Sequence, residues 1–153
     1  MPRLRPATDS DSAGVIALIE RVYSEYPGCV LDVDAEEPEL RRPASSFDRF
    51  WVLEDGDGIV GCAGCALCGG VLEMKKVYVD RSARGKGLGR RLIELVEAAA
   101  REEGVSRIEL WSDTRFETAH AVYERMGYER LPETRDLHDL SNTTEYHYAK
   151  EIS

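Results

Sequence analysis

Three glycines within six residues join a strand pattern to a helix pattern near the middle of the chain, in the run Arg84-Gly85-Lys86-Gly87-Leu88-Gly89. Residues 71–79 have strand character, and residues 88–103 carry apolar side chains at helical spacing. Glycine lets the backbone pass close to a ligand and expose successive N–H groups. The N-terminus of the following helix adds partial positive charge. The run is therefore typical of an anion site, and a diphosphate suits it.

The charge around this run differs from that of the chain as a whole. The 153 residues hold 20 Lys+Arg against 29 Asp+Glu, a net charge of −9. Five cations nevertheless surround the glycines, namely Arg81, Arg84, Lys86, Arg90 and Arg91. Because phosphate-tracking surfaces need a positive field, the overall balance argues against a nucleic-acid partner. The local cluster still permits a small anionic ligand.

Two well-known phosphate motifs do not fit the run. A Walker A loop needs G-x-x-x-x-G-K-[ST], but Leu88 follows Gly87. A dinucleotide fingerprint needs G-x-G-x-x-G, whereas Gly85, Gly87 and Gly89 give G-x-G-x-G. On these residues alone, a glycine-rich turn with solvated basic side chains remains an open alternative.

The remaining pattern predicts one domain over residues 1–153. The element order is β-α-(α)-β-β-β-α-β-α-β-β. Six of its seven strands have bounds in the pattern, at 3–5, 50–53, 59–67, 71–79, 108–111 and about 144–150, and the main helices are at 9–26, 88–103 and 117–126. This order predicts an α/β (α+β) fold, a mixed sheet with helices on both faces. No run approaches the ~18 apolar residues of a membrane span. The N-terminus has no apolar leader, so we expect a cytoplasmic chain with no membrane partner.

The cysteines offer a competing interpretation. Cys62, Cys65 and Cys68 form C-x-x-C-x-x-C, with Cys29 upstream, a spacing that also occurs in metal-binding interaction domains. Residues 59–67 nevertheless have the pattern of a strand, in which side chains three apart point to opposite faces. We therefore expect small buried cysteines and no metal.

Two blocks carry a family resemblance. Arg84-x-x-Gly87-x-Gly89, after Val77-x-Val79, resembles the acyl-CoA signature R/Q-x-x-G-x-G/A of the GNAT superfamily of N-acetyltransferases. Residues 119–128, AHAVYERMGY, resemble the family's second block, A-x-x-x-Y-x-x-x-G-F/Y. With strand 71–79, the two blocks lie within residues 71–128. The resemblance implies a GNAT-like, mostly antiparallel mixed sheet, and transfer of an acetyl group from acetyl-CoA to an amine.

The resemblance also implies how acetyl-CoA is held. The backbone of Val77 and Val79, on either side of Tyr78, is expected to bond the pantetheine arm, and an N–H near Val77 to polarise the acetyl carbonyl. The pyrophosphate is expected on the N–H groups of Gly85 to Arg90. The cofactor residues implied are Val77, Tyr78, Val79, Arg84, Gly85, Lys86, Gly87, Leu88, Gly89 and Arg90.

One position departs from the family pattern. Many members carry an Asn seven residues before the block's Tyr, where it contacts the cofactor, and this chain has Phe116 there. Thr118 and His120 are the two substitutes that we consider for that contact.

Tyr123 is the implied general acid. Acetyl transfer expels a thiolate, and a thiol pKa of ~8.5 against ~10 for tyrosine makes proton donation feasible. The alternative is a packing role, because Ala119, Val122, Tyr123 and Met126 share one helical face.

Glu73 is the implied general base, since an amine of pKa ~10.4 is protonated at neutral pH and must lose a proton. It lies six residues before Val79, where related histone acetyltransferases carry a catalytic Glu. The alternative is a surface carboxylate paired with Lys75 or Lys76. His120, His138 and His147 are further candidate bases.

The acceptor is the least determined part of the hypothesis. We expect a small molecule with a primary amine, with a protein N-terminus or lysine as the alternative. The acidic residues 32–39 either attract a cationic amine or form a solvated loop. A non-catalytic acyl-CoA-binding sensor is a further alternative, and a homodimer is compatible with the resemblance.

Overall fold

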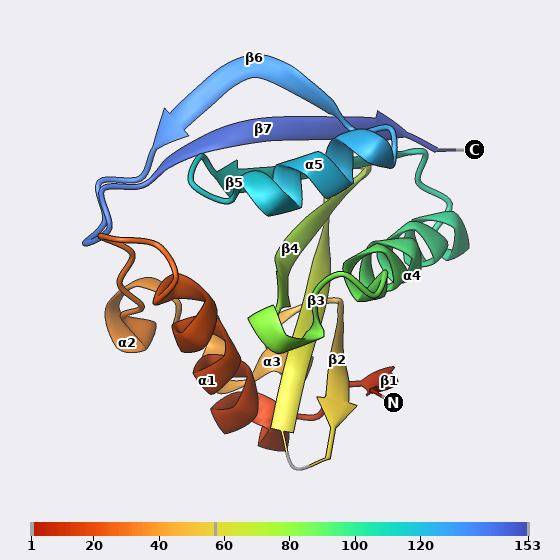
Figure 1. The fold of residues 1–153 in the computed structure, drawn as a ribbon. Helices are drawn as coiled ribbons and strands as arrows, with labels where there is room; N and C mark the ends of the chain where they lie inside the picture. The colour runs from red at the N-terminus through yellow and green to blue at the C-terminus, as the bar shows by residue number, and fades with distance from the viewer. Residues whose placement is uncertain (1, 57, 153) are drawn as a thin grey trace.

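The computed structural model describes residues 2–56 and 58–152. Within them, seven strands form one sheet in the order β1-β2-β3-β4-β5-β7-β6 (Figure 1). Their bounds are β1 Arg3–Pro6, β2 Arg49–Asp55, β3 Gly58–Cys68, β4 Val71–Val79, β5 Arg107–Asp113, β6 Glu129–Asp136 and β7 Thr144–Glu151. Neighbouring strands pair antiparallel except β4 with β5, which are parallel. The expected α/β (α+β) fold with a mixed, mostly antiparallel sheet is confirmed.

Helices cover both faces of this sheet, also as expected (Figure 1). The main helices are α1 Ser12–Tyr23 on one face, and α4 Leu88–Glu102 and α5 Glu117–Arg125 on the other; the short ones are η1 Asp9–Asp11, α2 Val33–Glu36, η2 Pro38–Arg41, α3 Pro43–Ser46 and η3 Arg81–Ala83. None of the helices in the described part of the chain is long and apolar enough to cross a membrane.

The first helix is shorter than the sequence predicted. Its expected first turn is the separate 3₁₀ turn η1, where the Asp11 carboxylate accepts the Thr8 N–H at 2.8 Å. At the other end, the N–H of Tyr26 bonds the carbonyl of Tyr23 at 3.0 Å, so the chain leaves the helix before Pro27.

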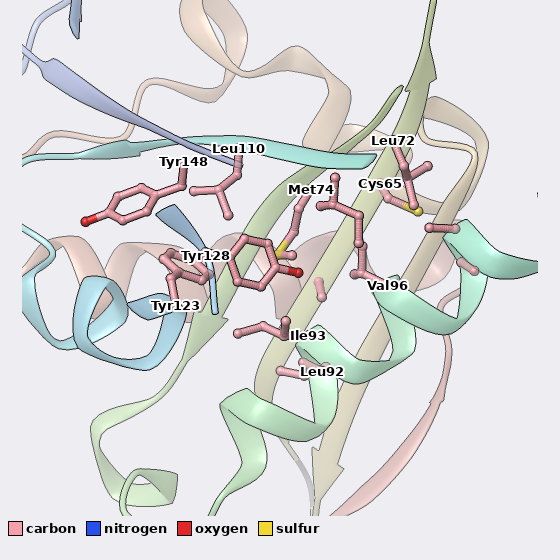
Figure 2. Close-up of a cluster of buried hydrophobic side chains, with 14 of the residues drawn as sticks. Cys65, Leu72, Met74, Leu92, Ile93, Val96, Leu110, Tyr123, Tyr128 and Tyr148 are labelled. Atoms are coloured by element: carbon pink, nitrogen blue, oxygen red, sulfur yellow. The ribbon is translucent and has the colours of Figure 1, made fainter. Parts of the chain in front are cut away.

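The two sides of the sheet carry separate apolar clusters. Cys62 belongs to the cluster that contains α1 residues such as Leu18, whereas Cys65 belongs to the cluster on the α4 side, with Leu72 and Val96 (Figure 2). The prediction that these two thiols face opposite sides is confirmed, because β3 alternates its side chains. Within residues 2–56 and 58–152, no group of three or more His, Cys, Asp or Glu side chains is arranged to hold a metal.

β4 and β5 separate shortly after they pair. Their recorded pairs are Leu72 with Ile108 and Glu73 with Glu109, after which the strands diverge (Figure 1). Further along β4, Lys76 and Val77 together oppose one residue of β3, which makes a β-bulge. Lys76 adopts φ 57°, and the Cys62 thiol donates to its carbonyl oxygen at 3.0 Å. The divergence and the bulge open the sheet between its two halves.

Candidate active site

A cavity of about 400 Å³, which we call cavity B, lies between the end of β4, the start of α4 and helix α5. All but one of the predicted cofactor residues line it, namely Val77, Tyr78, Val79, Arg84, Gly85, Gly87, Leu88, Gly89 and Arg90. The exception is Lys86, whose side chain is exposed. The fold therefore brings these sequence-predicted positions to one hollow.

The glycine-rich turn at this cavity has the backbone expected of an anion cradle. Gly85 and Gly87 have φ 80° and 74°, a left-handed conformation that L side chains disfavour. A Cβ at either glycine would meet nothing within 4 Å, so the turn borders open space. Gly87 is the N-cap of α4, whose first N–H groups have no partner inside the helix. The turn can therefore present several N–H donors to a phosphate.

The Arg84 side chain makes hydrogen bonds to other residues of the chain. Its Nη1 and Nη2 donate to the two carboxylate oxygens of Glu25 at 2.5 and 2.7 Å. Its Nε donates to the carbonyl oxygen of Val79 at 3.1 Å. The guanidinium thus ties the end of β4 to the turn after α1. Cationic charge toward solvent is left to exposed side chains such as Lys86 and Arg90.

Replacing Arg84 with Ala is therefore expected to act mainly on stability. The change removes a bidentate, charge-assisted pair and leaves Glu25 without it, which costs about 1.5–3 kcal/mol in the free energy of unfolding. Urea unfolding measures this loss. A tenfold loss of acetyl-CoA affinity at unchanged stability would instead assign the guanidinium to the phosphates.

A second cavity, cavity A, of about 520 Å³, adjoins cavity B. The wall that both share consists of Val77, Tyr78, Phe116, Ala119 and Tyr123. The β4 bulge and the first turns of α5 thus stand where the two cavities meet.

Tyr123 projects from α5 into this shared wall and is 5% exposed. Its ring lies 5.8 Å from the rings of both Tyr128 and Tyr148 (Figure 2). Burial raises its pKa well above the usual tyrosine value, because the charged phenolate loses solvation. The hydroxyl therefore keeps its proton at neutral pH. The packing role and the position at the two cavities coexist in this side chain.

Phe116 closes the same wall with an aromatic surface. Its ring centroid lies 5.0 Å from that of Tyr26 and 6.1 Å from those of Tyr23 and Tyr78. These contacts join α1 to the start of α5. At the position where the family pattern has an Asn, this chain thus has an aromatic side chain in contact with three tyrosines. Thr118, one of the two expected substitutes, lines cavity B.

The three histidines lie in different surroundings. His120 is buried, its Nε2 lies 3.0 Å from Ser112 Oγ, and it lines neither cavity. Burial lowers the pKa of His120, because the charged imidazolium loses more solvation than the neutral ring does. His147 stacks on Trp111 at 4.1 Å. His138 is the one of the three histidines that lines cavity A.

Acidic side chains dominate cavity A. Its acidic lining residues are Glu36, Glu37, Asp113, Asp139 and Glu145, against the basic residues Lys76 and Arg135, together with His138. Part of the acidic run 32–39 thus forms this wall. Glu37 forms an ion pair with Lys76, and the Tyr23 hydroxyl lies 3.3 Å from the same carboxylate. An amine bearing positive charge suits such a lining.

Glu73 lies outside both cavities. Its carboxylate is 3.6 Å from Lys75 Nζ, and it lines a third hollow, cavity C, of about 360 Å³. Cavity C shares Lys76, Tyr78 and Trp111 with cavity A, so the two adjoin. Glu73 and Tyr123 are therefore not in one cavity, although connected hollows lie between them.

Several residues of cavity A carried no signal in the sequence. Tyr23 looked like ordinary helix, Lys76 like an exposed strand residue, and Ser141 like part of a polar loop. The acidic run was the one local feature that pointed to this wall.

Comparison with known protein families identifies the family of this chain. The model of the Acetyltransferase (GNAT) family matches residues 16–128. The chain belongs to the GNAT family. Its relatives include the IAA acetyltransferase of Azospirillum brasilense, 32% identical over 84% of this chain and 86% of that protein. The uncharacterized N-acetyltransferase YjgM of Escherichia coli K12 is 29% identical over 85% and 83%. This GNAT protein is therefore an N-acetyltransferase enzyme.

Solved GNAT structures share its fold. An acetyltransferase of Staphylococcus aureus Mu50 matches with a TM-score of 0.85 at 19% identity, over 100% of both chains. The putative acetyltransferase yncA of Salmonella typhimurium, described with its cofactor acetyl-CoA, matches with a TM-score of 0.74 at 16% identity, over 100% of this chain and 95% of that one.

Proposed function

We propose that this GNAT enzyme transfers an acetyl group from acetyl-CoA to the primary amine of a small molecule by direct attack. The observation that carries the proposal is the shared wall, where Val77 and Tyr123 stand between cavity B and the acidic cavity A. An acyl donor in one cavity and an amine in the other meet at these residues.

Cavity B suits acetyl-CoA on chemical grounds. Its glycine-rich turn and the N-terminus of α4 offer donors to the pyrophosphate, beside exposed cations. The backbone of Val77 and Val79 offers strand-like bonds to the amides of the pantetheine arm. The bulge at Lys76 and Val77 turns a backbone N–H away from the ladder, which suits polarisation of the thioester carbonyl.

The reaction then balances as follows. The neutral amine forms a C–N bond to the thioester carbon, and the C–S bond breaks from the tetrahedral intermediate. The amine proton passes to a base, and the departing sulfur takes the proton of the Tyr123 hydroxyl, which is restored from solvent. Burial raises the pKa of Tyr123, so its hydroxyl still carries the proton when the sulfur departs.

We assign the base to Glu73, acting through water in cavities C and A. Its carboxylate lines the hollow that adjoins cavity A, beside Lys76. On this assignment Glu73→Gln lowers kcat at least tenfold and changes the shape of the pH–rate profile, while the KM for acetyl-CoA is unchanged. Steady-state kinetics from pH 5.5 to 9 measures both effects. Glu129→Gln, an exposed carboxylate on β6 outside the three cavities, is the control. A profile that is the same in wild type and Glu73→Gln would remove Glu73 from the mechanism.

The acceptor is expected to be a cationic small molecule. A volume of about 520 Å³ lies in the range of small-ligand pockets, and carboxylates outnumber cations in its lining. Such a site favours the ammonium form of an amine, which the base then deprotonates.

Thiol release from acetyl-CoA over a panel of amines tests the proposed function. We expect release that depends on a small primary amine and a matching acetylated product by mass spectrometry. Release with peptides alone would instead indicate a protein acetyltransferase. Saturable acetyl-CoA binding without release for any amine would indicate a sensor.

A further inference from the structure

Two segments that are far apart in the sequence meet beside cavity A, and both line it. Residues 28–41 follow α1 and residues 137–143 join β6 to β7; the two loops lie side by side in Figure 1. The Val30 N–H donates to Ser141 Oγ at 2.7 Å, and the Ser141 hydroxyl donates to the Val30 carbonyl at 3.1 Å. We call the two segments, with Arg115, the clasp.

Further contacts join the same parts. The Leu140 N–H donates to Glu36 Oε2 at 2.9 Å. Arg115, from the turn between β5 and α5, donates through Nη1 to Cys29 Sγ at 2.7 Å and through Nη2 to the Ser141 carbonyl. One guanidinium therefore holds both segments, through residues that themselves line cavity A.

The 137–143 side of the clasp is shaped by its own bonds. The Asp139 carboxylate accepts the N–H and the hydroxyl of Thr143, each at 2.8 Å. The Leu137 N–H donates to the Thr143 carbonyl at 2.9 Å. His138 and Asn142 hold φ 54° and 53°, which such local bonds must stabilise. The loop is thus preformed where it meets the other segment.

The 28–41 side is fixed to the sheet. Lys76 Nζ, at the β4 bulge, forms ion pairs with Glu37 and, at 3.3 Å, with Glu39. Both Lys76 and Glu37 are largely buried, with 16% and 13% of their side chains exposed. The clasp therefore spans cavity A from the bulge in β4 to the start of β7.

We propose that the clasp determines acceptor size, by closing the path along which a polypeptide would leave cavity A. This inference rests on the proposed function and adds Ser141, Glu36 and Arg115 as specificity-determining residues. A peptide acceptor continues at about 3.3 Å per residue beyond its reactive amine and needs an open groove. Here hydrogen bonds join the two segments that line one side of cavity A. A small amine fits inside without breaking them.

The test compares small amines with peptides bearing the same amine. Phenylalaninamide and lysinamide are each paired with a hexapeptide that begins with Phe or carries one Lys. For Ser141→Ala with Glu36→Gln, the ratio of kcat/KM for peptide to that for small amine is expected to rise at least tenfold. Each single variant is expected to give a smaller rise, and serves if the double variant does not fold. Ser45→Ala is the control, because it also removes a serine hydroxyl bond, here to the Asp9 carboxylate, away from the clasp.

Amide hydrogen exchange gives a readout that does not need an acceptor. Loss of protection in both segments of either single variant supports the clasp, and loss confined to the mutated segment overturns it. A wild-type enzyme that acetylates peptides as well as their small counterparts overturns the size inference, as does an unchanged ratio in the variants. Absence of thiol release with every amine overturns the proposed function, while the exchange result still decides the clasp.

Discussion

Replacing Tyr123 with Phe is expected to lower kcat about 100-fold, the lower end of what a general acid contributes. Tyr123 lies on α5, on the wall that cavities A and B share. Its ring remains in contact with Tyr128 and Tyr148 in the variant, so the fold and the acetyl-CoA affinity are preserved. Kinetic measurements, including single turnovers, give the fall in rate, and calorimetric titration gives the acetyl-CoA affinity.

Tyr128→Phe is the matched control for that experiment. Its hydroxyl is also buried, but it donates to Glu97 at 2.9 Å and lines neither cavity A nor cavity B. Removing it lowers stability by about 1–3 kcal/mol, because the buried carboxylate loses a partner, and leaves kcat unchanged. If the two variants lose kcat to the same extent, Tyr123 acts by packing alone and the sulfur is protonated from another source.

The strand, turn and helix around cavity B were predictable from the sequence, because each depends on local chemistry. Strand 71–79 is observed as β4 with the bounds predicted. The helix predicted at 88–103 is α4, and Gly104 follows it with φ 72°, as a left-handed C-terminal residue requires. The predicted cofactor residues lie within a few positions of one another along the chain, so one segment of sequence carries most of the lining of cavity B that was predicted.

Cavity A was not predictable in the same way. Val30 and Ser141 are 111 positions apart, and neither residue type indicates a partner at that distance. Glu37 and Lys76 are likewise 39 positions apart. Only the folded sheet, opened where β4 and β5 diverge, brings such residues to one wall.

Arg84 has a partner that its local motif does not indicate. It lines cavity B, as its place in the signature predicts, and its guanidinium also bonds Glu25, which lies 59 positions earlier. The bulge at Lys76 likewise depends on residues that lie elsewhere in the sequence. A lysine with φ 57° is unfavourable by itself, so the conformation depends on the strand pairing around it and on the Cys62 thiol.

Gly87→Val is expected to weaken acetyl-CoA binding at least tenfold, or about 1.4 kcal/mol. A Cβ at Gly87 meets nothing within 4 Å, so the effect comes from the backbone rather than from a clash. With φ 74°, a β-branched residue is strained by about 1–3 kcal/mol. Relief of that strain rotates the N-cap of α4 and turns its N–H donors away from the pyrophosphate. Calorimetric titration with acetyl-CoA measures the affinity.

Gly70→Val separates this effect from lost stability. Gly70 has φ 85° and also borders open space, but it lies in the β3–β4 hairpin, outside the three cavities. Both variants are expected to unfold at similarly lower temperatures, since the backbone strain is alike. Only Gly87→Val is expected to lose acetyl-CoA affinity, because only its turn starts the helix whose N–H groups face cavity B. An equal loss in both variants would mean that the affinity depends on overall stability, and that the anion is held by the exposed cations alone.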